Sequence, residues 1–137
     1  MHEWALAEAV IVAAAQTADR EHLEAVSVIR VRLGEAQRIS RDVFESSLRE
    51  ILAREAPRLR GARAEIETEP ALYKCRGCAS EWGLGVTLNM LNEEESEAVH
   101  FIPEMARVYA RCPDCSSPDF DLVAGRGIWL VSVTGVN

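Results

Sequence analysis

The chain has 137 residues, 48% of them hydrophobic and 27% charged, which is ordinary for one globular domain or for a domain with a small added module. Its formal net charge of −7 disfavours binding to the phosphate backbone of nucleic acids. No apolar run reaches the ~20 residues that cross a bilayer, and His2 and Glu3 stand where a secretory signal would carry basic residues. We therefore expect a cytoplasmic protein whose cysteines stay reduced.

The first 70 residues predict an alternation of helices and strands. Residues 3–20 carry apolar side chains at three- and four-residue steps, the pattern of an amphipathic helix. Residues 24–33 alternate like a strand, and residues 40–55 predict a second helix. Residues 62–68 alternate again. We expect an α+β fold with two helices packed on a small mixed sheet, including a parallel crossover between the two strands.

Shorter segments and turns follow Pro70. Strands are predicted at residues 82–88, 105–111, 120–124 and 128–133, with a loop or short helix at residues 89–97.

Four cysteines are arranged as two CxxC pairs, Cys75 with Cys78 and Cys112 with Cys115. Two intervening residues let one tight turn present both thiolates to a single ion, and two such turns complete a tetrahedron of soft donors, which suits Zn²⁺. Iron fits the same ligands, and two disulfides or four buried thiols are the alternatives without metal. Because four protein ligands leave no open position, the metal is expected to be structural.

The N-terminus offers a second kind of metal site. A free α-amine on Met1, the amide of His2 and the imidazole of His2 can chelate one ion, with the Glu3 amide or another residue as fourth donor. Planar nitrogen ligation favours Ni(II) or Cu(II) over zinc. Taken alone, His2 is also compatible with an incidental histidine, and His100 reads as an ordinary loop residue.

The motifs together are more informative than each one alone. An N-terminal Met1-His2-Glu3 opens a helix, residues 31–35 read VRLGE, the two cysteine pairs read CRGC and CPDC, and residues 125–127 read GRG. This set resembles the HypA family of nickel metallochaperones for [NiFe]-hydrogenase maturation, over essentially the whole chain. Residues 100–104 (HFIPE) are similar to the archaeal form of the family.

The resemblance implies nickel binding through the Met1 amine, His2 and the Glu3 backbone, with His100 as a further ligand in the archaeal form. It implies zinc binding by Cys75, Cys78, Cys112 and Cys115. It also implies that a zinc-binding module, residues 73–119, is inserted into a nickel-binding domain formed by residues 1–72 and 120–137.

The partners implied are a HypB-type nucleotide-hydrolysing maturation protein and the hydrogenase large-subunit precursor. Some members of the family exchange strands to form homodimers. Neither nucleic acid nor a membrane is expected as a partner.

Two other functions compete with nickel delivery. A zinc-ribbon module that binds protein or nucleic acid needs a basic face, and Arg107, Arg111 and Arg126 are its main candidates, opposed by the acidic balance of the chain. A zinc hydrolase needs an open metal position, which a Cys₄ site lacks. With no catalytic constellation and no phosphate-binding loop in the sequence, we predict a protein that is not an enzyme.

Overall fold

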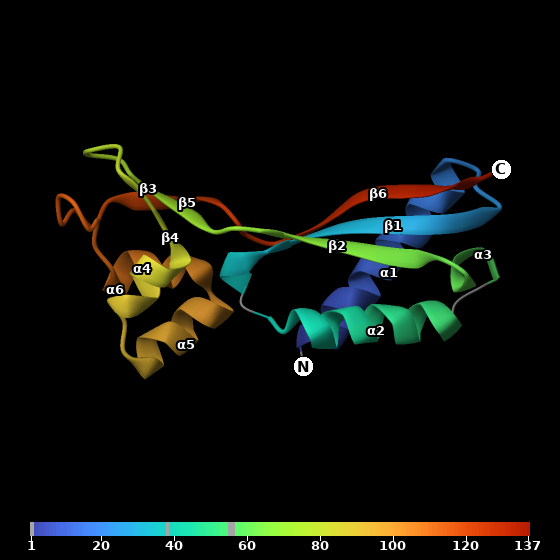
Figure 1. The fold of residues 1–137 in the computed structure, drawn as a ribbon, viewed down its shortest axis with the longest axis horizontal. Helices are drawn as coiled ribbons and strands as arrows, with labels where there is room; N and C mark the ends of the chain where they lie inside the picture. Colours follow the sequence, from blue (N-terminus) through green and yellow to red (C-terminus); the bar gives the residue numbers. More distant parts are fainter. Residues whose placement is uncertain (1, 38, 55–56) are drawn as a thin grey trace. The chain divides into compact units, whose positions relative to one another are not determined.

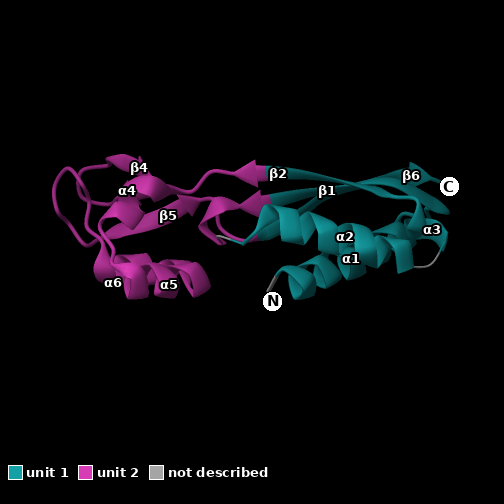
Figure 2. Ribbon diagram, turned by 60° about the horizontal axis from the view of Figure 1, so that its bottom comes forward, with its two compact units in different colours: residues 1–32, 39–67, 128–137 teal, residues 33–38, 68–127 magenta. Residues whose placement is uncertain are grey.

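The computed structural model describes residues 2–37, 39–54 and 57–137, with only the backbone described at His2. The chain forms two compact units, coloured separately in Figure 2. Unit 1 comprises Met1–Arg32, Ile39–Glu67 and Ile128–Asn137, and unit 2 comprises Leu33–Arg38 and Thr68–Gly127. In the described part of the chain, no helix is both long and apolar enough to cross a membrane.

Unit 2 extends beyond the predicted module, residues 73–119, at both ends. Glu35 accepts a hydrogen bond from the Ala71 amide at 2.9 Å, and the Ala36 amide donates to the Gly125 carbonyl at 2.9 Å. These bonds join the segment after the first strand to the rest of unit 2. The assignment of nickel binding to residues 1–72 and 120–137 stays a prediction.

Unit 1 packs helices on one face of a three-stranded sheet, as the sequence predicts (Figure 1). Its elements are α1 (His2–Arg20), β1 (Ala25–Gly34), α2 (Arg41–Arg54), α3 (Pro57–Arg60), β2 (Arg63–Glu69) and β6 (Ile128–Val136). The strand order is β2-β1-β6. Ser40 begins α2 as predicted, since its hydroxyl accepts the Val43 amide at 3.2 Å.

The sheet of unit 1 is mixed. Arg30 faces Glu65 and Arg32 faces Glu67, so residue numbers rise together along β1 and β2 and the two strands are parallel. Along β1 and β6 they run in opposite senses, because the Glu24 amide donates to Val136 and the Gly34 amide to Gly127. The expected parallel crossover through α2 is therefore present.

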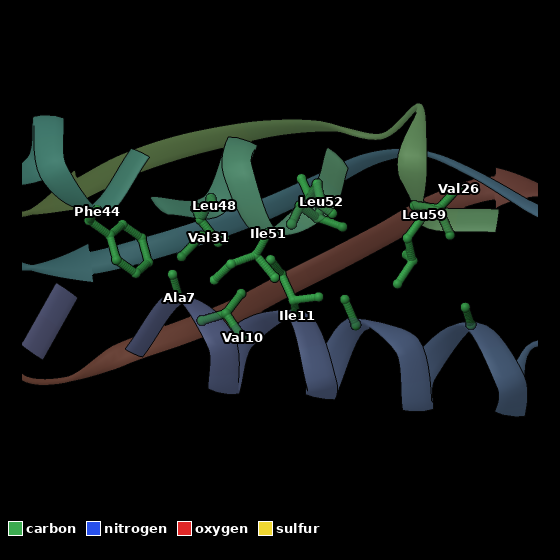
Figure 3. Packing of buried hydrophobic residues seen from close by; sticks show 13 residues of the cluster. Ala7, Val10, Ile11, Val26, Val31, Phe44, Leu48, Ile51, Leu52 and Leu59 are labelled. Atoms are coloured by element: carbon green, nitrogen blue, oxygen red, sulfur yellow. The ribbon is translucent and has the colours of Figure 1, made fainter. Parts of the chain in front are cut away.

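The core of unit 1 lies between the two long helices and the sheet. Figure 3 shows Val10 and Ile11 of α1 pointing toward Leu48 and Ile51 of α2, with Phe44 at one end. Two apolar residues near the helix starts lie outside this core: Trp4 of α1 is 36% exposed and Val43 of α2 is 50% exposed. Arg54 covers the Trp4 ring instead, with its guanidinium carbon 5.8 Å from the ring centre.

Unit 2 combines a second three-stranded sheet with short helices (Figure 1). Its elements are η1 (Glu35–Gln37), β3 (Leu72–Cys75), β4 (Glu81–Gly83), α4 (Leu84–Asn89), α5 (Glu93–Phe101), η2 (Pro103–Met105), α6 (Ala106–Tyr109) and β5 (Phe120–Ala124). The strand order is β4-β3-β5, and β3 is antiparallel to both neighbours. The predicted strand at residues 120–124 is confirmed.

Two other predicted strands of unit 2 are wrong. Residues 82–88 form only a short strand before α4, because Leu84 and Thr87 are buried at helical spacing and the Trp82 indole donates to the Thr87 hydroxyl at 3.0 Å. Residues 105–111 lie largely in η2 and α6, with Ala106 and Ala110 buried four residues apart. Short apolar runs fit either periodicity, so packing decides between them.

Of the two readings of residues 89–97, a loop or a short helix, the helix is present. Asn92 and Glu95 form a reciprocal capping box that starts α5.

Candidate metal centre

The sheet of unit 2 brings the two cysteine pairs to the same place. β3 ends at Cys75, and its antiparallel partner β5 begins at Phe120, directly opposite. One pair therefore follows β3, and the other precedes β5 at the same end of the sheet. Phe120 is fully buried against Tyr73 and Trp82, with ring centres 5.8 and 5.1 Å from its own. This aromatic cluster fixes the strand ends from which both pairs project.

The two pairs have the same backbone geometry, and we call residues 75–80 the first knuckle and residues 112–117 the second. In the first, the Cys75 amide donates to Ser80 at 2.9 Å and the Ala79 amide donates to Cys75 at 3.1 Å. In the second, the Cys112 amide donates to Ser117 at 2.9 Å and the Ser116 amide donates to Cys112 at 2.9 Å.

The residue after each pair adopts a left-handed backbone, with φ of 64° at Ala79 and 63° at Ser116. Such a conformation is uncommon for residues other than glycine. Its occurrence at matching positions in both knuckles indicates that the tight turn, which aims two sulfurs at one point, requires it.

The four sulfur atoms lie within 4.8 Å of one another. Cys75 and Cys115 approach to 3.6 Å, and so do Cys78 and Cys112. Tetrahedral ligation with a Zn–S distance of ~2.3 Å places sulfurs ~3.8 Å apart. All four cysteines are free thiols, which excludes the two-disulfide alternative for this structure. The spacing and the soft donor set fit Zn²⁺.

The pKa values of the thiols differ from one another, and this affects how the group binds a cation. The Cys78 amide donates toward the Cys75 sulfur at 3.5 Å, and this bond lowers the pKa of Cys75 to about 7. Although the Ser80 amide opposes the change, burial and the neighbouring sulfurs raise the pKa of Cys78 to about 12. Although the Ser117 amide opposes the change, the neighbouring Cys75 sulfur is the main cause that also raises the pKa of the Cys115 thiol. Thiols that are still protonated must lose their protons to bind a dication, so binding releases protons and weakens in acid.

Charged side chains surround the knuckles on the solvent side. Arg76 and Arg107 contact Asp119 and Asp121, and the Arg76 guanidinium holds the pKa of the Asp121 carboxyl below its usual range. The sequence does not indicate this group of charges, because the two aspartates follow the last cysteine by several residues. One feature of the sequence could have pointed to these charges, namely the position of Arg76 between the two cysteines of the first CxxC.

The predicted nickel ligands are only partly described. Met1 and the side chain of His2 lie outside the described residues. The Glu3 carboxylate accepts the Ser40 amide at 3.0 Å, and hydrogen bonds from the amides of Ser40 and Glu3 itself lower the pKa of Glu3 to about 2. The Glu3 side chain is thus engaged with the backbone at the start of α2.

His100 lies in the last turn of α5, in unit 2, and not in the loop that its sequence context indicated. Its ring packs edge-on against Phe101, with ring centres 5.0 Å apart.

Comparison with known proteins gives consistent matches over nearly the whole chain. Residues 1–135 match the family model described as "Hydrogenase/urease nickel incorporation, metallochaperone, hypA". The hydrogenase maturation factor HypA of Pyrococcus abyssi is 38% identical over 133 residues, which cover 97% of this chain and 94% of that protein. HypA of Thermococcus kodakarensis is 37% identical with the same coverage.

The solution structure of the Ni metallochaperone HypA from Helicobacter pylori has the same fold. It superposes with a TM-score of 0.62, covering 98% of this chain and 97% of the other, at 16% identity.

Proposed function

Because this chain belongs to the HypA family of metallochaperones, we propose that it binds Ni(II) at its N-terminus and delivers the ion to the [NiFe]-hydrogenase large subunit during maturation. The match of both the family model and the archaeal relatives across nearly the full length of the chain carries this proposal. A structural Zn²⁺ would be held by the thiolates of Cys75, Cys78, Cys112 and Cys115. When bound, this ion would cross-link the two knuckles and would take no part in a reaction.

The proposed nickel ligands are the Met1 amine, the His2 amide and imidazole, and the Glu3 backbone. Amine, amide and imidazole nitrogens in this order form a plane that suits Ni(II). All of them lie at one chain end, so a small movement of that end releases the ion. Protonation of the nitrogens weakens binding further.

The structure around Glu3 supports this assignment. Helix α1 begins at His2, so the ligand backbone is attached directly to a helix of unit 1. The Glu3 carboxylate accepts the Ser40 amide, so the side chain of this residue is directed toward the start of α2, while its backbone lies in the first turn of α1 beside the proposed ligands. Glu3 thereby connects the start of α1 to the start of α2.

The test is a Ni(II) titration of the full chain with its native N-terminus, followed by absorption spectroscopy of the planar nickel bands. Adding two residues before Met1 is expected to abolish those bands, and His2→Ala is expected to do the same. The same two residues added after Asn137 serve as the matched control. If the N-terminal extension left affinity and spectrum unchanged, nickel binding at this end would be ruled out.

His100 is a separate prediction within the same function. The archaeal resemblance proposes it as an additional nickel ligand, and His100→Ala should then reduce nickel affinity and change the spectrum. His22→Ala is the control, since His22 follows α1 and is exposed. Identical affinity and spectrum for His100→Ala and the unmodified chain would remove His100 from the ligand set.

The partners follow from the same proposal. A HypB-type nucleotide-hydrolysing protein and the hydrogenase large-subunit precursor would receive or exchange the ion, in the cytoplasm, and a homodimer through strand exchange is a further prediction. The chain itself would act by binding and transfer and not as an enzyme.

A further inference from the structure

Two ties outside the thiols connect the knuckles of unit 2. Arg76, between Cys75 and Cys78, donates through Nε and Nη2 to the two carboxylate oxygens of Asp121 at 2.8 and 2.9 Å. Its amide also donates to the Asp119 carbonyl at 3.0 Å. Each contact joins the first knuckle to the segment that follows the second.

The second tie runs the opposite way. Asp114, between Cys112 and Cys115, accepts a hydrogen bond from the hydroxyl of Ser80, at the end of the first knuckle. Arg76 of the first knuckle therefore contacts the segment that follows the second knuckle, and Asp114 of the second knuckle contacts the last residue of the first.

The first tie is the stronger of the two. A bidentate guanidinium–carboxylate pair is stronger and more directional than a single bond between half-exposed groups. Arg107 of α6 adds a second guanidinium 3.2 Å from Asp121, and Arg76 lies 3.6 Å from Asp119. Isolated surface ion pairs contribute little, but bidentate geometry within a network of four charges is the exception.

We propose that Arg76 is a positioning residue of the metal centre, which holds the two knuckles together through Asp121 and slows loss of the metal ion. The proposal rests on the zinc site assigned above. For zinc to leave, sulfurs from different knuckles must separate. A tie that does not involve the metal keeps a detached thiolate close, so it rebinds before the ion escapes.

The experiment measures the rate at which excess chelator removes zinc from the zinc-loaded full chain at low ionic strength. Arg76→Ala is expected to lose zinc roughly fivefold faster, the order of effect that a strong surface pair supplies. Asp121→Ala should match it, and the double variant should be no faster than either single variant. Arg76→Lys should be intermediate, because an ammonium does not form two parallel bonds.

The control is Arg63→Ala, which removes an exposed arginine that pairs with Glu65 in unit 1. Repeating the measurement at high salt concentration distinguishes loss of the ion pair from a general loss of packing. In ~1 M salt the ion pair is screened, so the unmodified chain and Arg76→Ala should converge on one rate.

The outcomes separate this inference from the zinc assignment. An unmodified chain that contains no zinc when purified without chelator would overturn the assignment and the inference with it. A zinc-containing chain whose loss rate is unchanged by Arg76→Ala and by Asp121→Ala would overturn the inference alone. A rate difference that persists unchanged in high salt would also overturn it, because the effect would then be packing.

Discussion

The cores of the two units differ in the kind of side chain that fills them. Unit 1 buries mainly branched aliphatic residues together with Phe44, spread along two long helices and a sheet. Unit 2 buries the cluster of Tyr73, Trp82 and Phe120 with several alanines and two cysteines of the metal site. Many of the buried residues of unit 2 are thus either small alanines or cysteines of the metal site. We therefore expect burial of apolar side chains to stabilise unit 1, whereas unit 2 should depend on metal binding for a large part of its stability.

Removing one metal ligand gives the largest expected effect. Cys112→Ser, or chelation of zinc from the unmodified chain, should unfold the knuckles and loosen unit 2 while unit 1 stays folded. Zinc binding to small structural sites contributes on the order of 10 kcal/mol, more than any one side chain in either core. Amide NMR spectra measured with and without metal would test this for each unit. Native signals from unit 2 in the Cys112→Ser chain would contradict the metal dependence.

A cavity in the core of unit 1 should destabilise that unit and leave the metal site unaffected. Phe44 is fully buried, and Phe44→Ala should lower the free energy of unfolding of unit 1 by about 3–5 kcal/mol. Zinc content should not change. The control is Val43→Ala, one residue earlier and 50% exposed, for which a change below about 0.5 kcal/mol is expected. Urea unfolding followed by circular dichroism, with zinc analysis of the same samples, provides both readouts.

The sequence predicts the helices and strands of unit 1 better than those of unit 2, because the apolar patterns of unit 1 are longer. Long amphipathic helices repeat their apolar pattern over several turns, so α1 and α2 were found nearly to their ends. In residues 82–88 and 105–111 the apolar runs are too short to separate a period of two from a period of 3.6. The buried pair Ala106 and Ala110 decides the second case, and only the packed structure reveals that these alanines are buried.

For the metal centre, the sequence predicts the four cysteine ligands but not the charged side chains that contact one another around them. CxxC spacing fixes the geometry of each knuckle locally, so four cysteines were predicted to cluster, and their sulfurs do. The contact of Arg76 with Asp121 joins residues 45 positions apart. It follows from the antiparallel register of β3 and β5, which no local pattern specifies.

Gly125 tests whether the backbone of unit 2 tolerates crowding away from the metal. Its φ is +85°, and an added Cβ would clash with Cα of Ala71. Gly125→Ala should therefore cost about 2 kcal/mol or more through strain and the clash together. Gly61→Ala is the matched control, because nothing lies within 4 Å of an added Cβ there. Thermal unfolding of the zinc-loaded chains compares them, and equal destabilisation by the two substitutions would show that the close approach is unimportant.

The smallest effect concerns acid, which should act on the two units through different groups. In unit 2, protons compete with the metal for the thiolates, so acid should release zinc. In unit 1, the Ser40 amide is the main cause that lowers the pKa of Glu3 from 4.5 to about 2. A lowered folded-state pKa stabilises the fold fully above pH ~4.5, and this contribution is lost as pH falls toward 2.

Glu3→Gln should remove that pH dependence from unit 1 and leave zinc release unchanged. Because the Glu3 side chain is partly exposed, the difference should stay below about 1 kcal/mol. Glu8→Gln, at an exposed position of α1, is the control. Urea unfolding of unit 1, followed through α1 amide signals between pH 5 and 3, measures the difference. If Glu3→Gln and the unmodified chain lost stability in parallel over that range, ionisation of the Glu3 carboxyl would not contribute to the stability of unit 1, and the lowered pKa of this group would have no consequence for folding.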